Sequence, residues 1–215
     1  DFKNLMKQNL INQHKANVFV YQVPDPEKYG VIELDNNNDI VSIEEKPASP
    51  KSNFAVTGIY FYDSSIFEAV NSIEPSDRGE LEISDAHQFL LDSGKAVSFS
   101  EITGWWKDTG QPSDLLEANR LVLDNITGSN AAKVDGKSSI IGKVVTGEGT
   151  KIINSQVRGP AVIGENVDVE NAYIGPYTAI SDDCSIIGSE VEYSIIMSGS
   201  SVENVERRIE ASLLG

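Results

Sequence analysis

The sequence predicts two architectures in one chain: a layered α/β domain over residues 1–126 and a parallel β-helix over residues 134–215, joined by a linker at 127–133. In the first part, helical and strand periodicities alternate along the chain, as they do when helices pack on a sheet. In the second part, aliphatic residues recur every six positions, which is typical of a solenoid built from short strands. With 215 residues, 40% of them hydrophobic, the chain is long enough to bury a substantial core.

The elements of the first part follow from their periodicity and from turn residues. Phe2, Leu5 and Leu10 have helical spacing, with Asp1 as a candidate N-cap. A run of Asn and Asp at 35–39 suits a hairpin turn, because both residue types tolerate turn conformations. Strands are predicted at 17–23, 31–34, 40–43, 55–63 and 96–102.

Three more helices are predicted between and after these strands. The first is expected to place Ile66, Phe67, Val70 and Ile73 on one face. The second covers 82–94 and ends at Gly94, a candidate C-cap. The third covers 112–126 and has Pro112 in its first turn, where proline is tolerated.

The second part repeats an aliphatic position every six residues in three registers. The registers are Val134, Ile140 and Ile152 with Thr146 between them, then Val157, Ile163 and Val169, then Ile174, Ile180 and Ile186. Each six-residue unit is expected to form one short strand whose aliphatic side chain points into a triangular core, and the one-residue slips between registers are expected at corners. Cys184 lies within this pattern, which favours a packing role over a reactive one.

Charge and cysteine content limit the classes of function. The net charge of −16 repels phosphate backbones, so nucleic acid is not an expected partner. No apolar run approaches the roughly 20 residues of a membrane helix, and no signal peptide pattern opens the chain. A sequence with one cysteine forms no internal disulfide, and we therefore expect a cytoplasmic protein.

Several short stretches carry groups that suit ligand binding, and each has an ordinary structural alternative. Lys46 follows a predicted strand, where open α/β sheets bind ligands, and could meet a phosphate while Glu45 accepts hydrogen bonds from sugar hydroxyls. The alternative is a solvated Glu–Lys pair of little energetic weight. Gly30 after Tyr29 would allow a close approach of a ligand to the backbone, or simply form a turn.

Three further positions have the same double interpretation. The planar fork of Arg78 suits a phosphate, but the residue could be a solvated arginine in the loop before a helix. Asp108, beside two tryptophans, suits Mg²⁺, or could be a hydrogen-bond acceptor in a turn. Gly58 could leave room for a ligand against its strand, or mark a β-bulge.

Taken in order, these stretches resemble one family. Five stretches are similar in order and spacing to motifs of the glucose-1-phosphate thymidylyltransferases. They are YGV at 29–31, EEKP at 44–47, SNFAVTGIYFYD at 52–63, RGELEISDA at 78–86 and WWKDTG at 105–110. The repeats beyond residue 133 resemble the long form of that family. The resemblance implies an incomplete Rossmann-like mixed sheet of the nucleotidyltransferase domain, followed by a left-handed parallel β-helix of hexapeptide repeats.

The resemblance also implies a reaction in nucleotide-sugar biosynthesis. In that family, a phosphate oxygen of glucose 1-phosphate attacks the α-phosphate of dTTP, and dTDP-glucose and pyrophosphate are formed without a covalent enzyme intermediate. The partners implied are glucose 1-phosphate and a nucleoside triphosphate, dTTP or UTP, between which this sequence does not discriminate. Mg²⁺ is the implied cofactor.

Residue roles are carried over from the matching motifs. Lys46 and Arg78 would bind the sugar phosphate and act as the catalytic residues. The substrate pocket would be lined by Tyr29, Gly30, Glu45, Lys46, Val56, Gly58, Tyr60, Arg78 and Trp106. Asp108 would be one of two carboxylates that hold Mg²⁺.

Some family features have no counterpart in the sequence. The Gly-rich, Arg-bearing nucleotide loop, a second lysine and the second metal-binding aspartate do not occur in the 215 residues. We therefore expect this chain to correspond to the family without roughly its first third, to be inactive by itself, and to self-associate as a homo-oligomer through exposed apolar sheet.

Two other functions remain as alternatives. A β-helix acyltransferase would need a general base, typically histidine, yet His14 and His87 both lie outside residues 133–215. Measurable affinity for coenzyme A would favour it. A non-catalytic regulatory or scaffold homologue would instead form a tight complex with a full-length transferase.

Overall fold

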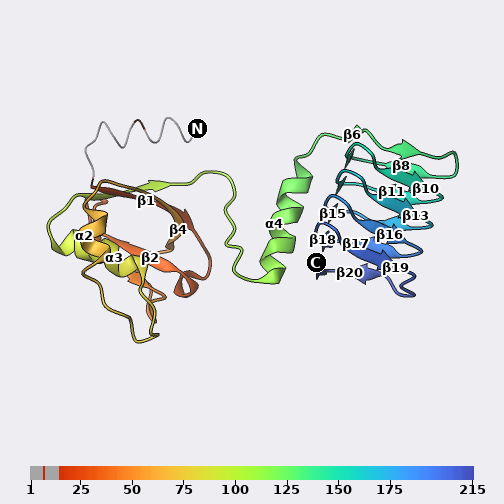
Figure 1. Ribbon diagram of the computed structural model, residues 1–215. Coiled ribbons are helices and arrows are strands. Elements are labelled where there is room, and N and C mark those ends of the chain that lie inside the picture. Colours follow the sequence, from red (N-terminus) through yellow and green to blue (C-terminus); the bar gives the residue numbers. More distant parts are fainter. Residues whose placement is uncertain (1–6, 8–14) are drawn as a thin grey trace. The chain divides into compact units, whose positions relative to one another are not determined.

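The computed structural model describes Lys7 and residues 15–215, which form two compact units (Figure 1). The sheet unit extends to Trp106 and the solenoid unit runs from Lys107 to Gly215. The helix predicted around Phe2 and Leu10 lies, apart from Lys7, outside the described residues. Across the described part of the chain, no helix is both long and apolar enough to cross a bilayer.

The sheet unit is built on a five-stranded mixed sheet. Its strands, in spatial order, are β3 (Ile40–Glu45), β2 (Gly30–Leu34), β4 (Phe54–Tyr62), β1 (Ala16–Gln22) and β5 (Val97–Glu101). The pairs β2–β3, β2–β4 and β1–β4 are antiparallel, and β1–β5 is parallel. A short 3₁₀ helix, η1 (Pro26–Lys28), precedes β2. The predicted mixed α/β architecture is thereby confirmed.

Two helices of the sheet unit pack on one face of this sheet: α2 (Ile66–Val70) and α3 (Ile83–Asp92). Ile66 and Ala69 of α2 are buried against Ala86 and Leu90 of α3. The predicted buried face of α2 is wrong in part, since Phe67 is 71% exposed. The small side chain of Ala69 allows close packing of the two helices, which turns Phe67 and Val70 outward.

The third helix, α4 (Pro112–Asp124), belongs to the solenoid unit. Its Asn119 Nδ2 donates to the carbonyl of Tyr177 at 2.9 Å, and the Tyr177 hydroxyl donates to Asp124 Oδ1 at 3.0 Å. Lys143 Nζ adds a bond to the Asp124 carbonyl at 3.0 Å. The two compact units therefore divide after Trp106, whereas the sequence placed α4 in the α/β domain.

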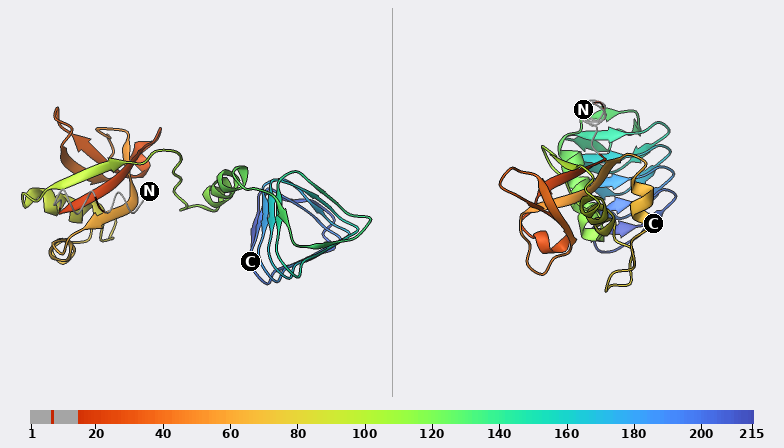
Figure 2. Two further views of the ribbon diagram at one scale, coloured as in Figure 1. Left: turned by 90° about the horizontal axis from the view of Figure 1, so that it is seen from above. Right: turned by 90° about the vertical axis from the view of Figure 1, so that its left-hand side faces the viewer.

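The solenoid unit consists of three parallel sheets that enclose a triangular core (Figure 2). The first sheet contains β7 (Lys133–Val134), β10 (Lys151–Ile153), β13 (Asp168–Glu170), β16 (Ser185–Ile187) and β19 (Ser201–Glu203). The second contains β8 (Ser139–Ile141), β11 (Gln156–Arg158), β14 (Tyr173–Ile174), β17 (Glu190–Glu192) and β20 (Ile209–Glu210). The third contains β6 (Ser129–Asn130), β9 (Val144–Thr146), β12 (Ala161–Ile163), β15 (Thr178–Ile180), β18 (Ile195–Ile196) and β21 (Leu213–Leu214).

Strand β6 lies within residues 127–133, the stretch predicted as a linker. It pairs in parallel with β9, and the carbonyl of Thr146 and its hydroxyl both accept from the amide of Ala131. The Thr146 hydroxyl also donates to Asn130 Oδ1 at 2.6 Å. Thr146 is the polar residue that interrupts the first aliphatic register, and it is buried because it fastens this segment to the solenoid.

The six-residue pattern is confirmed as the inward position of the strands from Ile152 to Ile186, whereas Val134 on the first coil is 36% exposed. Ile152, Val157 and Ile163 lie on the first, second and third sheets of one coil, and all three are buried. Val157 pairs with Ile174 and Ile174 with Val191, so these middle coils advance by 17 residues on the second sheet. Cys184 is buried in the same core, as expected for a packing role.

The missing eighteenth residue falls at one corner, between the first and second sheets. There Asn154, Asn171 and Gly188 have φ between 46° and 56°, the left-handed region that Asn and Gly tolerate best. The predicted one-residue slips are therefore corners, and in three consecutive coils they lie at equivalent positions.

Candidate functional site

The strand end at EEKP faces the start of β2. Gly30, the first residue of β2, pairs with Glu45, the last residue of β3. The amide of Lys46 donates to the carbonyl of Tyr29 at 2.9 Å, and Lys46 has φ 45°. The chain therefore turns sharply directly after Glu45, and the Lys46 side chain is exposed at that turn.

The Glu45 carboxylate is held by a helix residue that the sequence did not point to. Ser84, in the first turn of α3, donates to Glu45 Oε2 at 2.8 Å. A Cβ atom at Gly30 would lie 2.8 Å from Ser84 Oγ, 2.9 Å from Glu45 Oε2 and 3.8 Å from Val56 Cβ. A side chain at position 30 would therefore displace Ser84 or Glu45, and Glu45, Ser84 and Val56 surround one point.

Arg78 lies in the loop before α3 and is surrounded by carboxylates. Its guanidinium is 2.9 Å from Glu80 Oε2, 3.5 Å from Glu82 Oε1 and 4.0 Å from Glu45 Oε1. Ser76 supports the loop by donating from its hydroxyl to Glu82 Oε1 at 3.1 Å. The loop thus brings the guanidinium of Arg78 to the Glu45 carboxylate.

Trp106 packs behind the start of β2. Its ring contacts the ring of Tyr29 edge-on, with centroids 5.6 Å apart, and its Nε1 donates to the carbonyl of Thr57 at 3.3 Å. Thr57 follows Val56 on β4, so Trp106 and Tyr29 border the same region as Gly30. The next residue in the motif, Lys107, already belongs to the other compact unit.

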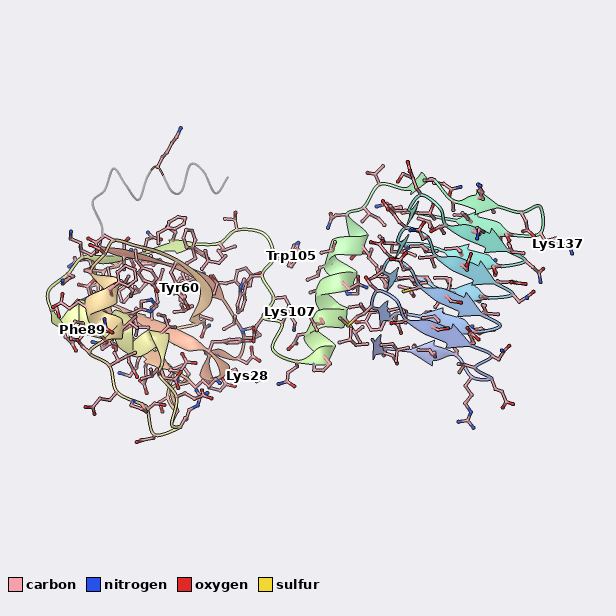
Figure 3. The ribbon with its side chains drawn as sticks, viewed as in Figure 1. Lys28, Tyr60, Phe89, Trp105, Lys107 and Lys137 are labelled. Atoms are coloured by element: carbon pink, nitrogen blue, oxygen red, sulfur yellow. The ribbon has the colours of Figure 1, made fainter. Side chains whose placement is uncertain are left out.

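Gly58 and Tyr60 lie further along β4. Gly58 has φ 79°, and the β1–β4 register shifts between the pairs Val18–Tyr60 and Val20–Val56. Gly58 therefore lies in a β-bulge, the structural alternative considered for it. Tyr60 packs in the same hydrophobic cluster as Val56, and burial together with the negative charge of Glu45 raises the pKa of its hydroxyl. Figure 3 shows the Tyr60 ring in the interior of the sheet unit.

The structure thus gathers most of the predicted substrate residues at one end of β2, β3 and β4. Asp108 belongs to the other compact unit, the solenoid unit, and is exposed. Within the described ranges, no group of three or more His, Cys, Asp or Glu side chains is arranged to hold a metal ion. Ser84 and Glu82 were missed by sequence reasoning, and the one signal for them is their place at the start of α3, directly after the Arg78 loop.

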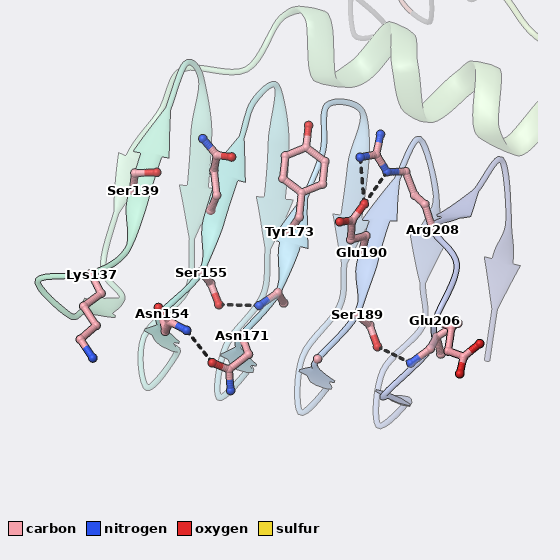
Figure 4. A pocket seen from close by; sticks show the side chains of 14 residues that line it. Lys137, Ser139, Asn154, Ser155, Asn171, Tyr173, Ser189, Glu190, Glu206 and Arg208 are labelled. Carbon is pink, nitrogen blue, oxygen red and sulfur yellow. Dashed lines mark hydrogen bonds and ion pairs between the residues drawn. The ribbon is translucent and has the colours of Figure 1, made fainter.

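The solenoid unit has its own groove, of about 630 Å³, along the corner between its first two sheets (Figure 4). Its polar side chains largely satisfy one another. Asn154 Nδ2 donates to Asn171 Oδ1 at 2.6 Å, while Arg208 pairs with Glu190 at 2.9 Å and lies over the Tyr173 ring at 4.9 Å. Residues 133–215 contain no histidine, so this groove lacks the usual general base of an acyltransferase.

Comparisons with known proteins agree on one family. Residues 1–125 match the nucleotidyl transferase family model. A glucose-1-phosphate thymidylyltransferase of Streptomyces griseus is 48% identical over 93% of this chain and 56% of its own length, and one of Streptomyces antibioticus is 46% identical over the same shares. A Methanocaldococcus jannaschii relative, the bifunctional protein GlmU, is 39% identical over 90% of this chain and 48% of its own length.

A solved structure supports the same assignment. A crystal structure from Bacillus anthracis, assigned as a glucose-1-phosphate thymidylyltransferase and solved with sucrose, is 40% identical with a TM-score of 0.52. The match covers 60% of this chain and 52% of that one. The chain spans a little over half the length of the first curated relatives it matches. It belongs to the nucleotidyl transferase family, as a homologue of the glucose-1-phosphate thymidylyltransferases with a C-terminal β-solenoid.

Proposed function

We propose that this chain forms the sugar-phosphate side of an enzyme that transfers a thymidylyl group from dTTP to glucose 1-phosphate. The products would be dTDP-glucose and pyrophosphate. The observation that carries the proposal is the convergence of Glu45, Ser84 and Val56 around Gly30, together with the guanidinium of Arg78 at 4.0 Å from Glu45 Oε1.

Within this proposal, the carboxylate and the cations have different tasks. Glu45 would accept hydrogen bonds from sugar hydroxyls, and Ser84 keeps its carboxylate in place from the other side. Arg78 would bind the sugar phosphate with its planar fork, and Lys46 would add a point charge from the turn after β3. Tyr29, Val56, Gly58, Tyr60 and Trp106 would complete the pocket wall.

The chemical step would be an in-line displacement. A phosphate oxygen of glucose 1-phosphate forms a bond to the α-phosphorus of the nucleotide, the bond to the β-phosphate oxygen breaks, and pyrophosphate leaves with that electron pair. Catalysis then consists of positioning and of charge neutralisation, for which Arg78 and Lys46 are suited.

The charges around Arg78 bear on how a phosphate would enter. Glu45, Glu80 and Glu82 already neutralise the guanidinium, and the side chain of Glu82 is only 12% exposed. A phosphate dianion would therefore have to replace the exposed Glu80 and leave the less accessible Glu82 in place. We expect Arg78 to keep Glu82 as an anchor while its outer face turns to the ligand.

Mg²⁺ remains part of the proposal in a limited way. Bound there, the ion would neutralise nucleotide phosphate charge, and Asp108 would supply one oxygen ligand. Among the described residues, Asp108 is part of no group of three or more His, Cys, Asp or Glu side chains that could hold a metal ion. No step of the reaction is therefore assigned to the ion.

The proposal is tested by measuring binding of glucose 1-phosphate calorimetrically. Arg78→Met removes a charge-assisted interaction worth about 1.5–3 kcal/mol, so affinity should fall roughly 10- to 100-fold. Arg207→Met, in the exposed last corner of the solenoid unit, is the matched control and should bind like the wild type. Glucose without phosphate should not distinguish Arg78→Met from the wild type. Equal affinity of Arg78→Met and wild type for glucose 1-phosphate would contradict the proposal.

Pyrophosphate release with dTTP, and then with UTP, tests the transfer reaction itself. We expect no turnover from the 215-residue chain alone, and turnover when it is joined to the residues that precede the matched region in its relatives. Turnover by the chain alone that disappears in Lys46→Ala would show that the nucleotide is held by groups not recognised in this sequence. A tight complex with a separate full-length transferase would favour the regulatory alternative.

A further inference from the structure

His87 is a buried titratable residue to which the proposed reaction gives no role. It lies on α3, three residues after Ser84, and its side chain has 0% exposure. Its Nε2 is 2.6 Å from the Tyr62 hydroxyl, and its Nδ1 has no hydrogen-bond partner among the described residues. A buried polar atom without a partner costs about 1–3 kcal/mol, so an apolar residue would be the simpler choice for packing alone.

The His87 ring lies between two tyrosines of β4. It is stacked on Tyr62, with an interplanar angle of 28° and centroids 5.7 Å apart. It meets the Tyr60 ring at 60°, with centroids 4.9 Å apart. Tyr60 and Tyr62 also contact each other at 5.6 Å. The three rings form one closed group in which the position of each ring limits the other two.

Tyr60 links this group of rings to the candidate site. The negative charge of Glu45 contributes to the raised pKa of the Tyr60 hydroxyl. Tyr60 also packs on the cluster that contains Val56, the side chain nearest to Gly30 after Ser84 and Glu45. A change in the position of the Tyr60 ring therefore changes the wall of the proposed sugar pocket.

We propose that His87 is a positioning residue whose ring fixes Tyr60 against the cluster that contains Val56 and thereby shapes the sugar pocket. The inference rests on the proposed function, because it assigns His87 to the same pocket. His87 is too deeply buried to contact a substrate, and it acts through Tyr60 alone. The bond to Tyr62 fixes the orientation of the imidazole, and the edge contact transmits that orientation to Tyr60.

The test separates the ring from the nitrogen atoms of His87. His87→Leu and His87→Gln both remove the aromatic ring, one with an apolar and one with a polar side chain, so the inference is tested if either variant folds. His87→Phe keeps a ring of similar shape without the nitrogen that meets Tyr62. Leu90→Ala is the control, because Leu90 is buried on the same helix but packs in the cluster of Ala16, Ile66, Ala69 and Ala86.

Two measurements are made on the full chain: calorimetric affinity for glucose 1-phosphate, and NMR signals of ¹³C-labelled tyrosine rings. We expect both ring-less variants to bind about 3- to 10-fold more weakly and to shift the Tyr60 signals, because they lose an aromatic pair. His87→Phe should restore affinity to within about twofold, and Leu90→Ala should lose stability without losing affinity.

The outcomes distinguish this inference from the proposed function. Wild-type affinity in His87→Leu or His87→Gln would overturn the inference and leave the proposed function intact. An equal loss of affinity in Leu90→Ala would also overturn it, since the effect would then be one of general stability. A wild-type chain that does not bind glucose 1-phosphate would remove both.

Discussion

Replacing Gly30 by alanine tests the geometry on which the candidate site depends. The new Cβ atom would lie 2.8 Å from Ser84 Oγ and 2.9 Å from Glu45 Oε2, distances that real Cβ atoms do not adopt. Both clashing atoms are at the ends of side chains, so the strain can be relieved when Ser84 and Glu45 move apart. That movement breaks their 2.8 Å hydrogen bond.

The expected magnitude follows from that bond. A hydrogen bond to a charged group contributes about 1.5–3 kcal/mol, and the unfolding free energy of the sheet unit should fall by a similar amount. For a domain of this size the corresponding change in melting temperature is roughly 5–15 °C. Displacement of Glu45 should also weaken glucose 1-phosphate binding roughly tenfold.

The assay compares Gly30→Ala with Gly136→Ala in thermal unfolding and in ligand binding. A Cβ atom at Gly136 would meet no atom within 4 Å, so that variant should behave like the wild type. In a Ser84→Ala background one clash and the hydrogen bond are already absent, and the penalty of Gly30→Ala should shrink by at least about 0.5 kcal/mol. A Gly30→Ala protein with unchanged stability and affinity would refute the argument that Glu45 and Ser84 exclude a side chain at position 30.

Two further predictions concern buried polar side chains. Burial lowers the pKa of His87 to about 4 from an ordinary 6.5, so the unfolded chain binds a proton between these values while the folded chain does not. The unfolding free energy of the sheet unit, measured in urea, should therefore fall by about 3 kcal/mol as pH falls from 7 to 4. His87→Phe should lack this part of the pH dependence. An identical change of unfolding free energy with pH in both proteins would contradict the prediction. In the solenoid unit, Thr146→Val removes an acceptor for the Ala132 amide and should lower the unfolding free energy by about 1–2 kcal/mol. Thr178→Val removes a buried hydroxyl that has no partner among the described residues, and should leave the unfolding free energy unchanged or raise it by up to about 1 kcal/mol. Equal effects of the two substitutions on denaturant midpoints would show that the hydrogen bonds of Thr146 carry no weight.

The solenoid was predictable from sequence because its geometry repeats. The same register positions are buried in successive middle coils, so Ile152, Val157 and Ile163 identify the core without knowledge of any distant contact. The place of α4 was not predictable in the same way. An amphipathic helix has an apolar face wherever it packs, and only the bonds of Asn119 and Asp124 to the solenoid show which unit it belongs to.

The candidate site was predictable only in part, for a related reason. Motifs placed Glu45 and Arg78 at strand ends and loops, but they do not specify contacts between residues far apart in sequence. Ser84 holds Glu45 across a separation of 39 residues, and nothing local to ELEISDA marks its hydroxyl for that task. His87 has the same character, because its partners Tyr60 and Tyr62 lie on another element.

The middle coils advance by 17 residues on the second sheet. A solenoid of this kind can therefore gain or lose residues in whole coils more easily than in six-residue units. Removing or duplicating a whole coil would shift later residues along the axis by one strand spacing, about 4.8 Å, and would keep every side chain on its own sheet. Removing one six-residue unit would instead rotate everything after it by a third of a turn. If the removed unit lay between Tyr173 and Glu190, Arg208 and Glu190 would occupy a different face from Tyr173. The solenoid can therefore vary in length in whole turns while its three faces keep their identities.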